Sequence, residues 1–151
     1  MANKDAAFGL KPVREMGGAP YSGGQSRYRI ASGATTPIFQ GDLVTQLTAG
    51  VIGRHTATGT VPIVGVFNGV SYTDPTTGEQ VFNNYYPGSI AASDIIASVI
   101  DDPNIVFEVQ ADDTFPVADL FGNFDIVASS NTNVLCVIQN HIMGQKGAGL
   151  A

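Results

Sequence analysis

Turn-forming residues occur so often in this chain that they leave room only for short elements. Glycine occurs 18 times and proline eight times in 151 residues. The stretches between them are rich in Val, Ile, Thr, Phe and Tyr, which favour strands, whereas Gly and Pro favour the turns that join strands. Lys and Glu are scarce, which argues against long solvent-exposed helices. We therefore predict an all-β fold, either a small β-barrel or a β-sandwich.

The length of the chain predicts one β domain with two extended ends. We expect an extended, Gly-rich, basic N-terminal arm over 1–24, a single β domain over 25–143, and a short C-terminal tail over 144–151. Arg27 and Arg29 alternate with Tyr28 and Ile30, which is the period-2 pattern of a half-buried strand.

Several segments have the composition of hairpins or of single strands. Gly65 and Gly69 share a face with Phe67, and this spacing indicates a closely packed neighbour or a bulge. The expected elements are hairpins over 42–54, 62–86 and 95–110, a helical turn within 114–123, and closing strands over 124–128 and 133–143.

Charge divides the chain unevenly. Residues 1–30 carry five basic and two acidic side chains, a balance of +3, whereas 31–151 carry two basic and eleven acidic ones, a balance of −9. This asymmetry indicates a basic segment that lies on an acidic partner surface, which could be another copy of the same body. The acidic body argues against nucleic-acid binding.

The N-terminus and the cysteine content favour a soluble protein that is made inside a cell. The first residues lack the apolar core of a signal peptide, and no run approaches the roughly 18 apolar residues of a membrane span. Cys136 is the single cysteine, so no disulfide forms within the chain.

Potential catalytic residues have a more ordinary structural interpretation. Cys136 could pair with His55 or His141 as a nucleophile and its base. However, Cys136 alternates with Val134 and Ile138 as core residues do, and His141 points to the opposite face of a regular strand. We therefore predict no catalytic site and no enzymatic activity.

Ligand-binding motifs are equally sparse. The acidic pairs Asp101/Asp102 and Asp112/Asp113 could hold a cation, but no calcium-loop pattern is present, and acids before Pro or Asn are common in turns. The glycines of 17–24 lack the Lys-Ser/Thr of a phosphate-binding loop. We therefore expect no cofactor, no metal and no small-molecule substrate. Phe82, Tyr85 and Tyr86 could form a stacking platform for sugars or bases, or an interface between proteins.

Five segments in the same order resemble small head proteins of tailed bacteriophages, the capsid decoration or cement proteins. The segments are AFGLKPVREMGGAPYSGGQSRYRIA, GDLV, GVFNGVSYTDPTTGEQVFNNYYPGS, DDPNIVFEVQAD and NHIMGQKGAGLA. Residues 65–87 followed by DDPN are the most specific part. The chain departs from this likeness at ASSNTNVLCVI, where similar proteins have a longer insertion.

The resemblance implies a non-enzymatic virion protein on the outer surface of the phage head. Such proteins bridge neighbouring major capsid proteins, commonly as homotrimers. The expected partners are therefore the major capsid protein and copies of the chain itself, without nucleic acid or membrane. An alternative is a carbohydrate- or host-surface-binding β module of a phage particle.

Specific residues are candidates for the capsid or subunit contacts. The apolar anchors would be Phe8, Leu10, Pro12 and Val13. The basic residues that would pair with acids are Lys11, Arg14, Arg27 and Arg29, and Tyr85 and Tyr86 would lie at the subunit interface.

Overall fold

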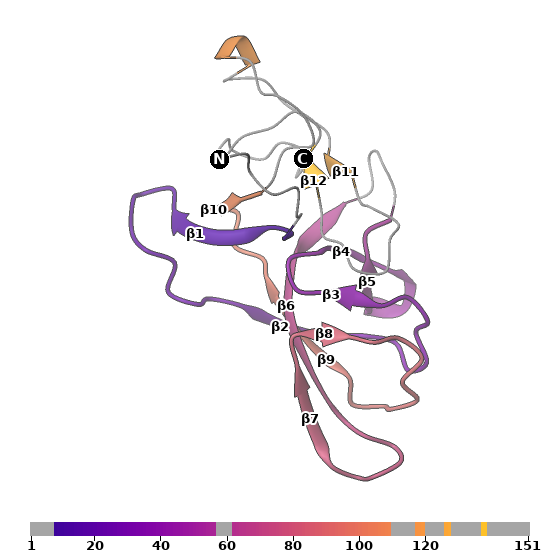
Figure 1. The fold of residues 1–151 in the computed structure, drawn as a ribbon. Helices are drawn as coiled ribbons and strands as arrows, with labels where there is room; N and C mark the ends of the chain where they lie inside the picture. Colours follow the sequence, from indigo (N-terminus) through magenta and orange to yellow (C-terminus); the bar gives the residue numbers. More distant parts are fainter. Residues whose placement is uncertain (1–7, 57–61, 110–116, 120–125, 128–136, 139–151) are drawn as a thin grey trace, which may run out of the picture.

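The computed structural model describes residues 8–56, 62–109, 117–119, 126–127 and 137–138. These residues form β-strands and two single turns of 3-10 helix, so the predicted all-β class is confirmed (Figure 1). The strands are β1 (Lys11–Glu15), β2 (Ser26–Arg29), β3 (Ile38–Phe39), β4 (Leu43–Gln46), β5 (Ile52–Arg54), β6 (Ile63–Thr73), β7 (Gln80–Asn83), β8 (Tyr85–Tyr86), β9 (Ile96–Ile100), β10 (Ile105–Glu108), β11 (Ile126–Val127) and β12 (Val137–Ile138). The 3-10 turns are η1 (Thr48–Gly50) and η2 (Val117–Asp119), and η2 lies where a helical turn was predicted.

The long strand β6 organises the main sheet. The strand order is β2-β9-β6-β4-β5, and β7 adds to β6 beyond the end of β4. Neighbouring strands are antiparallel throughout this sheet. Three further pairs, β1–β10, β3–β8 and β11–β12, form two-stranded sheets.

The described strands do not close into a barrel. The two ends of the main sheet meet at an isolated parallel bridge between Ile30 and Ile52, and no continuous ladder joins β2 to β5 within the described residues. Of the two predicted architectures, the closed barrel is therefore not formed by the described strands, because a barrel requires paired strands around its whole circumference.

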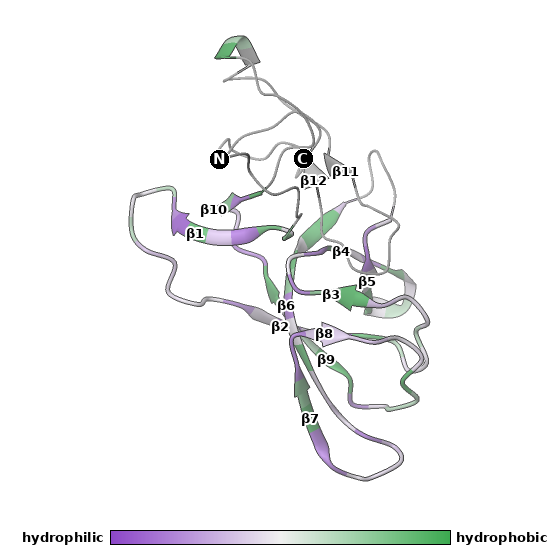
Figure 2. Cartoon of the chain, in the orientation of Figure 1, coloured by the Kyte–Doolittle hydropathy of each residue, from purple (hydrophilic) through white to green (hydrophobic). Residues whose placement is uncertain are grey.

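Two hydrophobic clusters lie on opposite sides of β6. Val66 belongs to one and Phe67 to the other, because successive side chains of a strand point to opposite faces. Phe67 lies with Tyr86, Ile38 and Val99 in the larger cluster, whereas Val66 lies with Leu10, Leu43, Ile100 and Val109. Figure 2 shows the hydrophobic residues along β3, β6 and β9, whereas β1 has hydrophilic residues at both ends.

Two predicted hairpins are confirmed. In the first, Val44 pairs with Arg54 across β4 and β5, and η1 forms the turn with Ala49 at φ 69°. In the second, Thr73 pairs with Gln80 across β6 and β7, although Tyr85 and Tyr86 at the predicted end of this hairpin pair with β3 instead. The turn between them is held by the Asp74 carboxylate, which accepts the Thr76 N–H at 2.7 Å. Both connections are short, so the residues that indicate each turn lie next to one another in the sequence.

The predicted hairpin over 95–110 is wrong. β9 lies between β2 and β6, whereas β10 pairs with β1. The Asp101 carboxylate accepts hydrogen bonds from Ser26 at 3.1 Å and Tyr28 at 2.8 Å, which fixes the end of β9 beside β2. With β2 on one edge and β6 on the other, β9 has no free edge for β10.

The glycine pattern on β6 has the predicted cause. A Cβ at Gly65 would overlap the carbonyl oxygen of Ile100 and lie 2.8 Å from Cγ1 of Val99. The β6–β9 register shifts between Phe67 and Gly69, which makes Asn68 the extra residue of a bulge. The close neighbour and the bulge are therefore both present, but the predicted shared face is wrong for Gly69. The bulge places Phe67 opposite Val99 and Gly69 opposite Ser98, so Gly69 and Phe67 lie on different faces of the sheet.

Candidate functional site

Residues 8–15 of the predicted arm are docked on the body. Lys11 is the register partner of Glu108 on β10, and Leu10 is only 8% exposed. The Leu10 N–H donates to the Gly41 carbonyl at 3.0 Å. Gly9 has a φ of +78°, and a Cβ there would lie 2.9 Å from the Gly41 backbone. The chain can approach this closely because both residues lack a side chain.

The segment after β1 projects from the molecule as a loop, seen at the left of Figure 1. The Glu15 N–H donates to Ala19, and the Met16 N–H donates to Asn104, each at 2.8 Å. These two bonds fix the base of the loop. Met16 itself remains 52% exposed.

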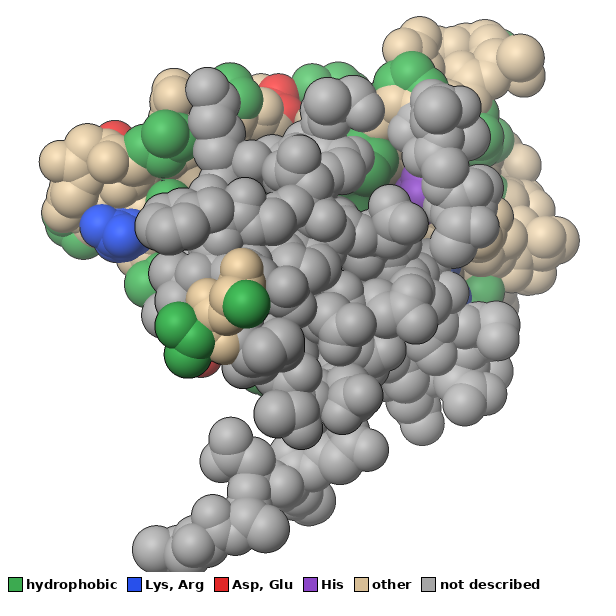
Figure 3. Space-filling view, turned by 90° about the horizontal axis from the view of Figure 1, so that it is seen from above, with side chains coloured by type: hydrophobic (Ala, Val, Ile, Leu, Met, Phe, Trp, Pro, Cys, Tyr) green, Lys and Arg blue, Asp and Glu red, His purple; other side chains and the backbone are tan. Residues whose placement is uncertain are grey.

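Exposed apolar and basic side chains alternate along residues 8–16. Phe8, Val13 and Met16 are among the exposed large hydrophobic residues, and Lys11 and Arg14 are exposed between them. We call these five residues the N-terminal surface. On the same side of the molecule, at the left of Figure 3, a basic side chain lies among hydrophobic ones. Apolar area with interspersed cations is typical of a surface that contacts another protein.

Two of the predicted contact residues lie in the core instead. Leu10 packs with Val66 and Ile100, and Tyr86 is fully buried. The Tyr86 hydroxyl donates to the Ala34 carbonyl at 2.9 Å, and burial raises the pKa of Tyr86 above its usual value. Neither side chain reaches a partner from these positions. Pro12, a third predicted anchor, is half-buried.

The arginines of β2 point to solvent, as predicted. Arg27 and Arg29 are exposed, whereas Tyr28 is half-buried and packs against the larger cluster. Arg29 donates to the Ser93 carbonyl at 3.0 Å. The hydrogen bond from Tyr28 to Asp101 raises the pKa of the Tyr28 phenol.

Tyr85 is the partly exposed member of the tyrosine pair. Its ring stacks on Phe39 with centroids 6.1 Å apart and an interplanar angle of 13°. With 42% of its surface exposed, Tyr85 can contact a partner, but Tyr86 on the opposite face of β8 cannot join it. Of the three aromatic residues considered for a stacking platform, Tyr86 is therefore excluded by its burial, whereas Phe82 and Tyr85 are exposed.

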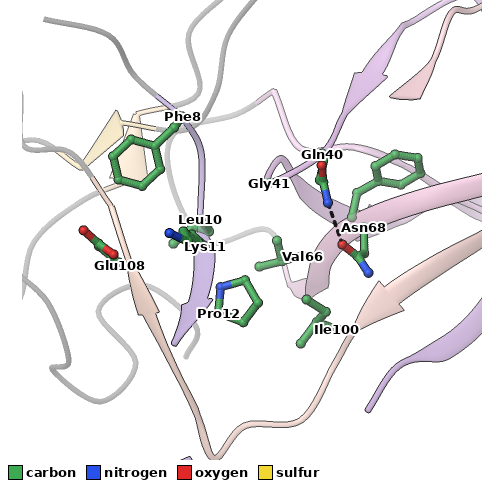
Figure 4. A pocket seen from close by; sticks show the side chains of 11 residues that line it. Phe8, Leu10, Lys11, Pro12, Gln40, Gly41, Val66, Asn68, Ile100 and Glu108 are labelled. Atoms are coloured by element: carbon green, nitrogen blue, oxygen red, sulfur yellow. Dashed lines mark hydrogen bonds between the residues drawn. The ribbon is translucent and has the colours of Figure 1, made fainter. Parts of the chain in front are cut away.

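A cavity of about 440 Å³ lies between β1 and the main sheet (Figure 4). Its lining is apolar on one side, where Leu10, Pro12 and Val66 gather. Gln40 and Asn68 lie on the other side, and the Gln40 amide donates to Asn68 Oδ1 at 2.9 Å. Asn68 in turn donates to Gln25 at 2.8 Å, so three amides form a row across the solvent face.

The buried polar residues serve the fold. Asp42 accepts the Phe39 N–H at 3.0 Å and faces the Arg54 Nε at 3.3 Å. Burial raises the pKa of Asp42, while the hydrogen bond from Phe39 and the charge of Arg54 act against that rise. His55 is 4% exposed, and its Nδ1 has no hydrogen-bond partner among the described residues. Cys136, its candidate partner, and His141, the alternative base for Cys136, lie outside the described residues.

The acidic pair Asp101/Asp102 acts in a turn. Asp101 binds two side chains of β2, and Asp102 accepts the Asn104 N–H at 2.8 Å. Among the described residues, no group of three or more His, Cys, Asp or Glu side chains could hold a metal ion. Asp112 and Asp113 lie outside the described residues, as does the predicted tail over 144–151.

Within the described segments, no helix has both the length and the apolar character needed to cross a membrane. No family model, no curated protein and no solved structure matches this chain. The functional assignment of the candidate surfaces therefore depends on the chemistry of their own side chains.

Sequence reasoning missed the amide row. The residues around Asn68 in β6 are mostly apolar, so the sequence did not indicate an exposed polar site there. The side chain points outward because Asn68 is the extra residue of the bulge. Gly65 and Gly69 were the available signal, because glycines in a strand often mark a bulge.

Proposed function

We propose that this chain is a non-enzymatic structural protein that binds the outside of an assembled phage head and stabilises it. The ordered segments that resemble cement proteins support this proposal, as does the N-terminal surface. In that role the chain bridges neighbouring major capsid proteins, as a trimer if it follows the proteins that it resembles.

The observation that carries the proposal is the exposure of Val13 and Met16 beside Lys11 and Arg14. These side chains lie on or next to a strand that is already paired with β10. Because that strand is ordered before it meets a partner, docking loses less conformational entropy than the ordering of a free arm would. The two cations can then pair with acidic groups on the shell.

Stabilisation follows from mass action and from copy number. A protein that binds the assembled shell but not its separate subunits shifts the equilibrium toward assembly. If several copies or several contacts engage together, weak individual contacts add through avidity.

The test is binding of the purified chain to phage heads assembled without it. Co-sedimentation measures occupancy, and the melting temperature of the particle measures stabilisation. We expect the double variant V13D/M16D to bind at least tenfold more weakly, because it places charge within an apolar contact. The matched control is L47D, since the 47% exposure of Leu47 lies between those of Val13 and Met16, and Leu47 lies beside η1.

Two results would contradict the proposal. One is unchanged occupancy of the double variant, and the other is an equal loss for L47D.

A further experiment tests the contribution of the two cations. Raising the salt concentration from 0.05 to 0.5 M should weaken docking of the native chain more than docking of the variant K11Q/R14Q.

A further inference from the structure

A second hollow, of about 330 Å³, lies on the solvent face of the main sheet. Phe82 on β7 forms one side and Arg27 on β2 forms the other. Its size is at the lower end of the roughly 300–1,000 Å³ typical of small-molecule sites. We call it the Phe82 hollow.

Strand register explains how distant residues gather there. Arg27 pairs with Ser98, and Ser98 pairs with Gly69, so these three residues share one face of the sheet. In the next row Ser71 pairs with Phe82, which puts the ring on that same face. Gly69 and the two serines are small, so they leave a depression between the arginine and the ring.

The polar groups of the hollow are available to a ligand. The side chains of Arg27, Ser71 and Ser98 make no hydrogen bond or ion pair within the described part of the chain. The same holds for Asn84 at the rim. Asn68, the extra residue of the β6 bulge, binds Gln25 and forms the wall toward the β1 cavity. Bulges commonly re-aim a side chain in this way beside functional sites.

Phe82 supplies an unusual amount of exposed apolar surface. Its side chain is 75% exposed at the edge of the sheet, where β7 contributes only four residues. The face of an aromatic ring is flat and carries partial negative charge, so it attracts polarised C–H groups as well as apolar surface. No acidic residue lines the hollow, and Arg27 presents a fork of donors that matches a carboxylate.

We infer that the Phe82 hollow binds an oligosaccharide that carries carboxylate groups. The C–H face of one sugar ring packs on Phe82, and the hydroxyls bond to the serine and amide side chains. A uronate or sialate carboxylate pairs with Arg27. The backbones of β2 and β7 lie three strand spacings apart, about 14 Å. A ligand that reaches both Arg27 and Phe82 is therefore longer than a single sugar ring.

The composition of the hollow favours a saccharide over an acidic protein segment. Sugar hydroxyls donate and accept hydrogen bonds, and serine hydroxyls and amide groups do the same. The centre of a protein interface is richer in apolar anchors, whereas this hollow has one exposed ring at its edge.

The test uses the isolated full-length chain and trigalacturonate, a uronic acid trimer, titrated by calorimetry or by NMR. We expect saturable binding that is at least fivefold weaker in F82A and in R27Q. Maltotriose, a neutral trimer, should bind at least fivefold more weakly than trigalacturonate. The matched controls are F8A and R14Q, which remove an exposed ring and an exposed cation outside the hollow. They should stay within twofold of the native chain.

Several results would overturn the inference. These are a lack of saturable binding, equal losses in R14Q and R27Q, and equal affinity for maltotriose. Tighter binding of hexaglutamate than of trigalacturonate would assign the face to an acidic protein segment instead. The assay contains no phage heads, and the two variants expected to lose binding, F82A and R27Q, are not used in the docking test, so the two proposals can fail separately.

Discussion

Gly65 lies where the backbone of β9 leaves no room for a side chain. The atoms that a Cβ would meet include the carbonyl group of Ile100, which cannot move without disturbing the ladder. Gly24 offers a contrast, since nothing lies within 4 Å of its Cβ position and its φ is not positive. Comparing alanine substitutions at the two positions therefore distinguishes the effect of a steric clash from the general effect of replacing glycine.

We predict that Gly65→Ala lowers the free energy of unfolding by about 3 kcal/mol, at the upper end of the usual cost of overpacking. Gly24→Ala should change it by less than about 1 kcal/mol, and in the stabilising direction. Urea unfolding followed by circular dichroism measures both. Similar effects for the two variants would contradict the contact at Gly65.

A second residue-scale prediction concerns Asp42, whose pKa burial raises above the usual 3.8. A raised pKa means that the folded state keeps the proton longer than the unfolded state does, so stability falls as pH rises from 3.8 through the folded pKa. The variant D42N has no carboxyl group at this position, so its stability lacks this dependence on pH. Its stability relative to the native chain should therefore rise over that pH window and then level off. A relative stability that stays constant or declines would contradict the assignment.

Asp94 should behave in the opposite way. Its carboxylate accepts hydrogen bonds from the Thr73 hydroxyl at 2.6 Å and the Thr73 N–H, and these bonds hold its pKa below 3.8. The contribution of Asp94 is complete above pH 3.8 and is lost as pH falls through the lowered value. We expect the stability gap between D94N and the native chain to narrow below pH 3.8. Unfolding curves at pH 5 and pH 2.5 measure this, and an unchanged gap would contradict it.

At the scale of elements, β1 depends on Leu10 for its attachment to the body. Leu10 directly precedes β1, whereas Val13 within β1 is 44% exposed, so Val13 contributes to the outer surface rather than to the attachment. We predict that Leu10→Ala costs about 2–3 kcal/mol and raises the rate of tryptic cleavage after Arg14. Val13→Ala is the matched control and should leave cleavage unchanged. Equal protection of both variants would show that β1 is held by other contacts.

The elements that the sequence predicted correctly are those whose signals are local. Thr48-Ala49-Gly50 and Asp74–Gly78 each specify a turn, and short turns fix the pairing of the strands beside them. β9 and β10 look like a third hairpin, but their pairing depends on β1 and β2, which lie far away in the sequence. No local pattern encodes such a choice of partner.

In the candidate site, too, features set by neighbouring residues could be predicted, whereas features set by distant segments could not. The exposure of Arg27 and Arg29 follows from alternation within four residues. The burial of Tyr86 could also have been anticipated, because adjacent strand residues point to opposite faces and only one tyrosine of the pair can face outward. The burial of Leu10 could not, since it depends on docking against Val66 and Ile100.

At the scale of the whole molecule, the pairing is mostly between segments distant in sequence. β1 pairs with β10, β2 with β9, and β3 with β8. Long loops must close before such contacts form, so we predict refolding in milliseconds to seconds rather than microseconds. The chain has no tryptophan, so stopped-flow tyrosine fluorescence is the measurement. Refolding complete within tens of microseconds would contradict the prediction.

The bridge between Ile30 and Ile52 has a consequence for solutions in which many copies of the chain meet. It brings the two ends of the main sheet together, and the strands at those ends, β2 and β5, have four and three residues. Short edge strands that carry charged side chains are poor templates for an incoming strand. Arg27 and Arg29 add mutual repulsion when the β2 edges of two copies approach each other. We therefore expect these two edges of the main sheet to resist edge-to-edge pairing when copies of the chain are concentrated.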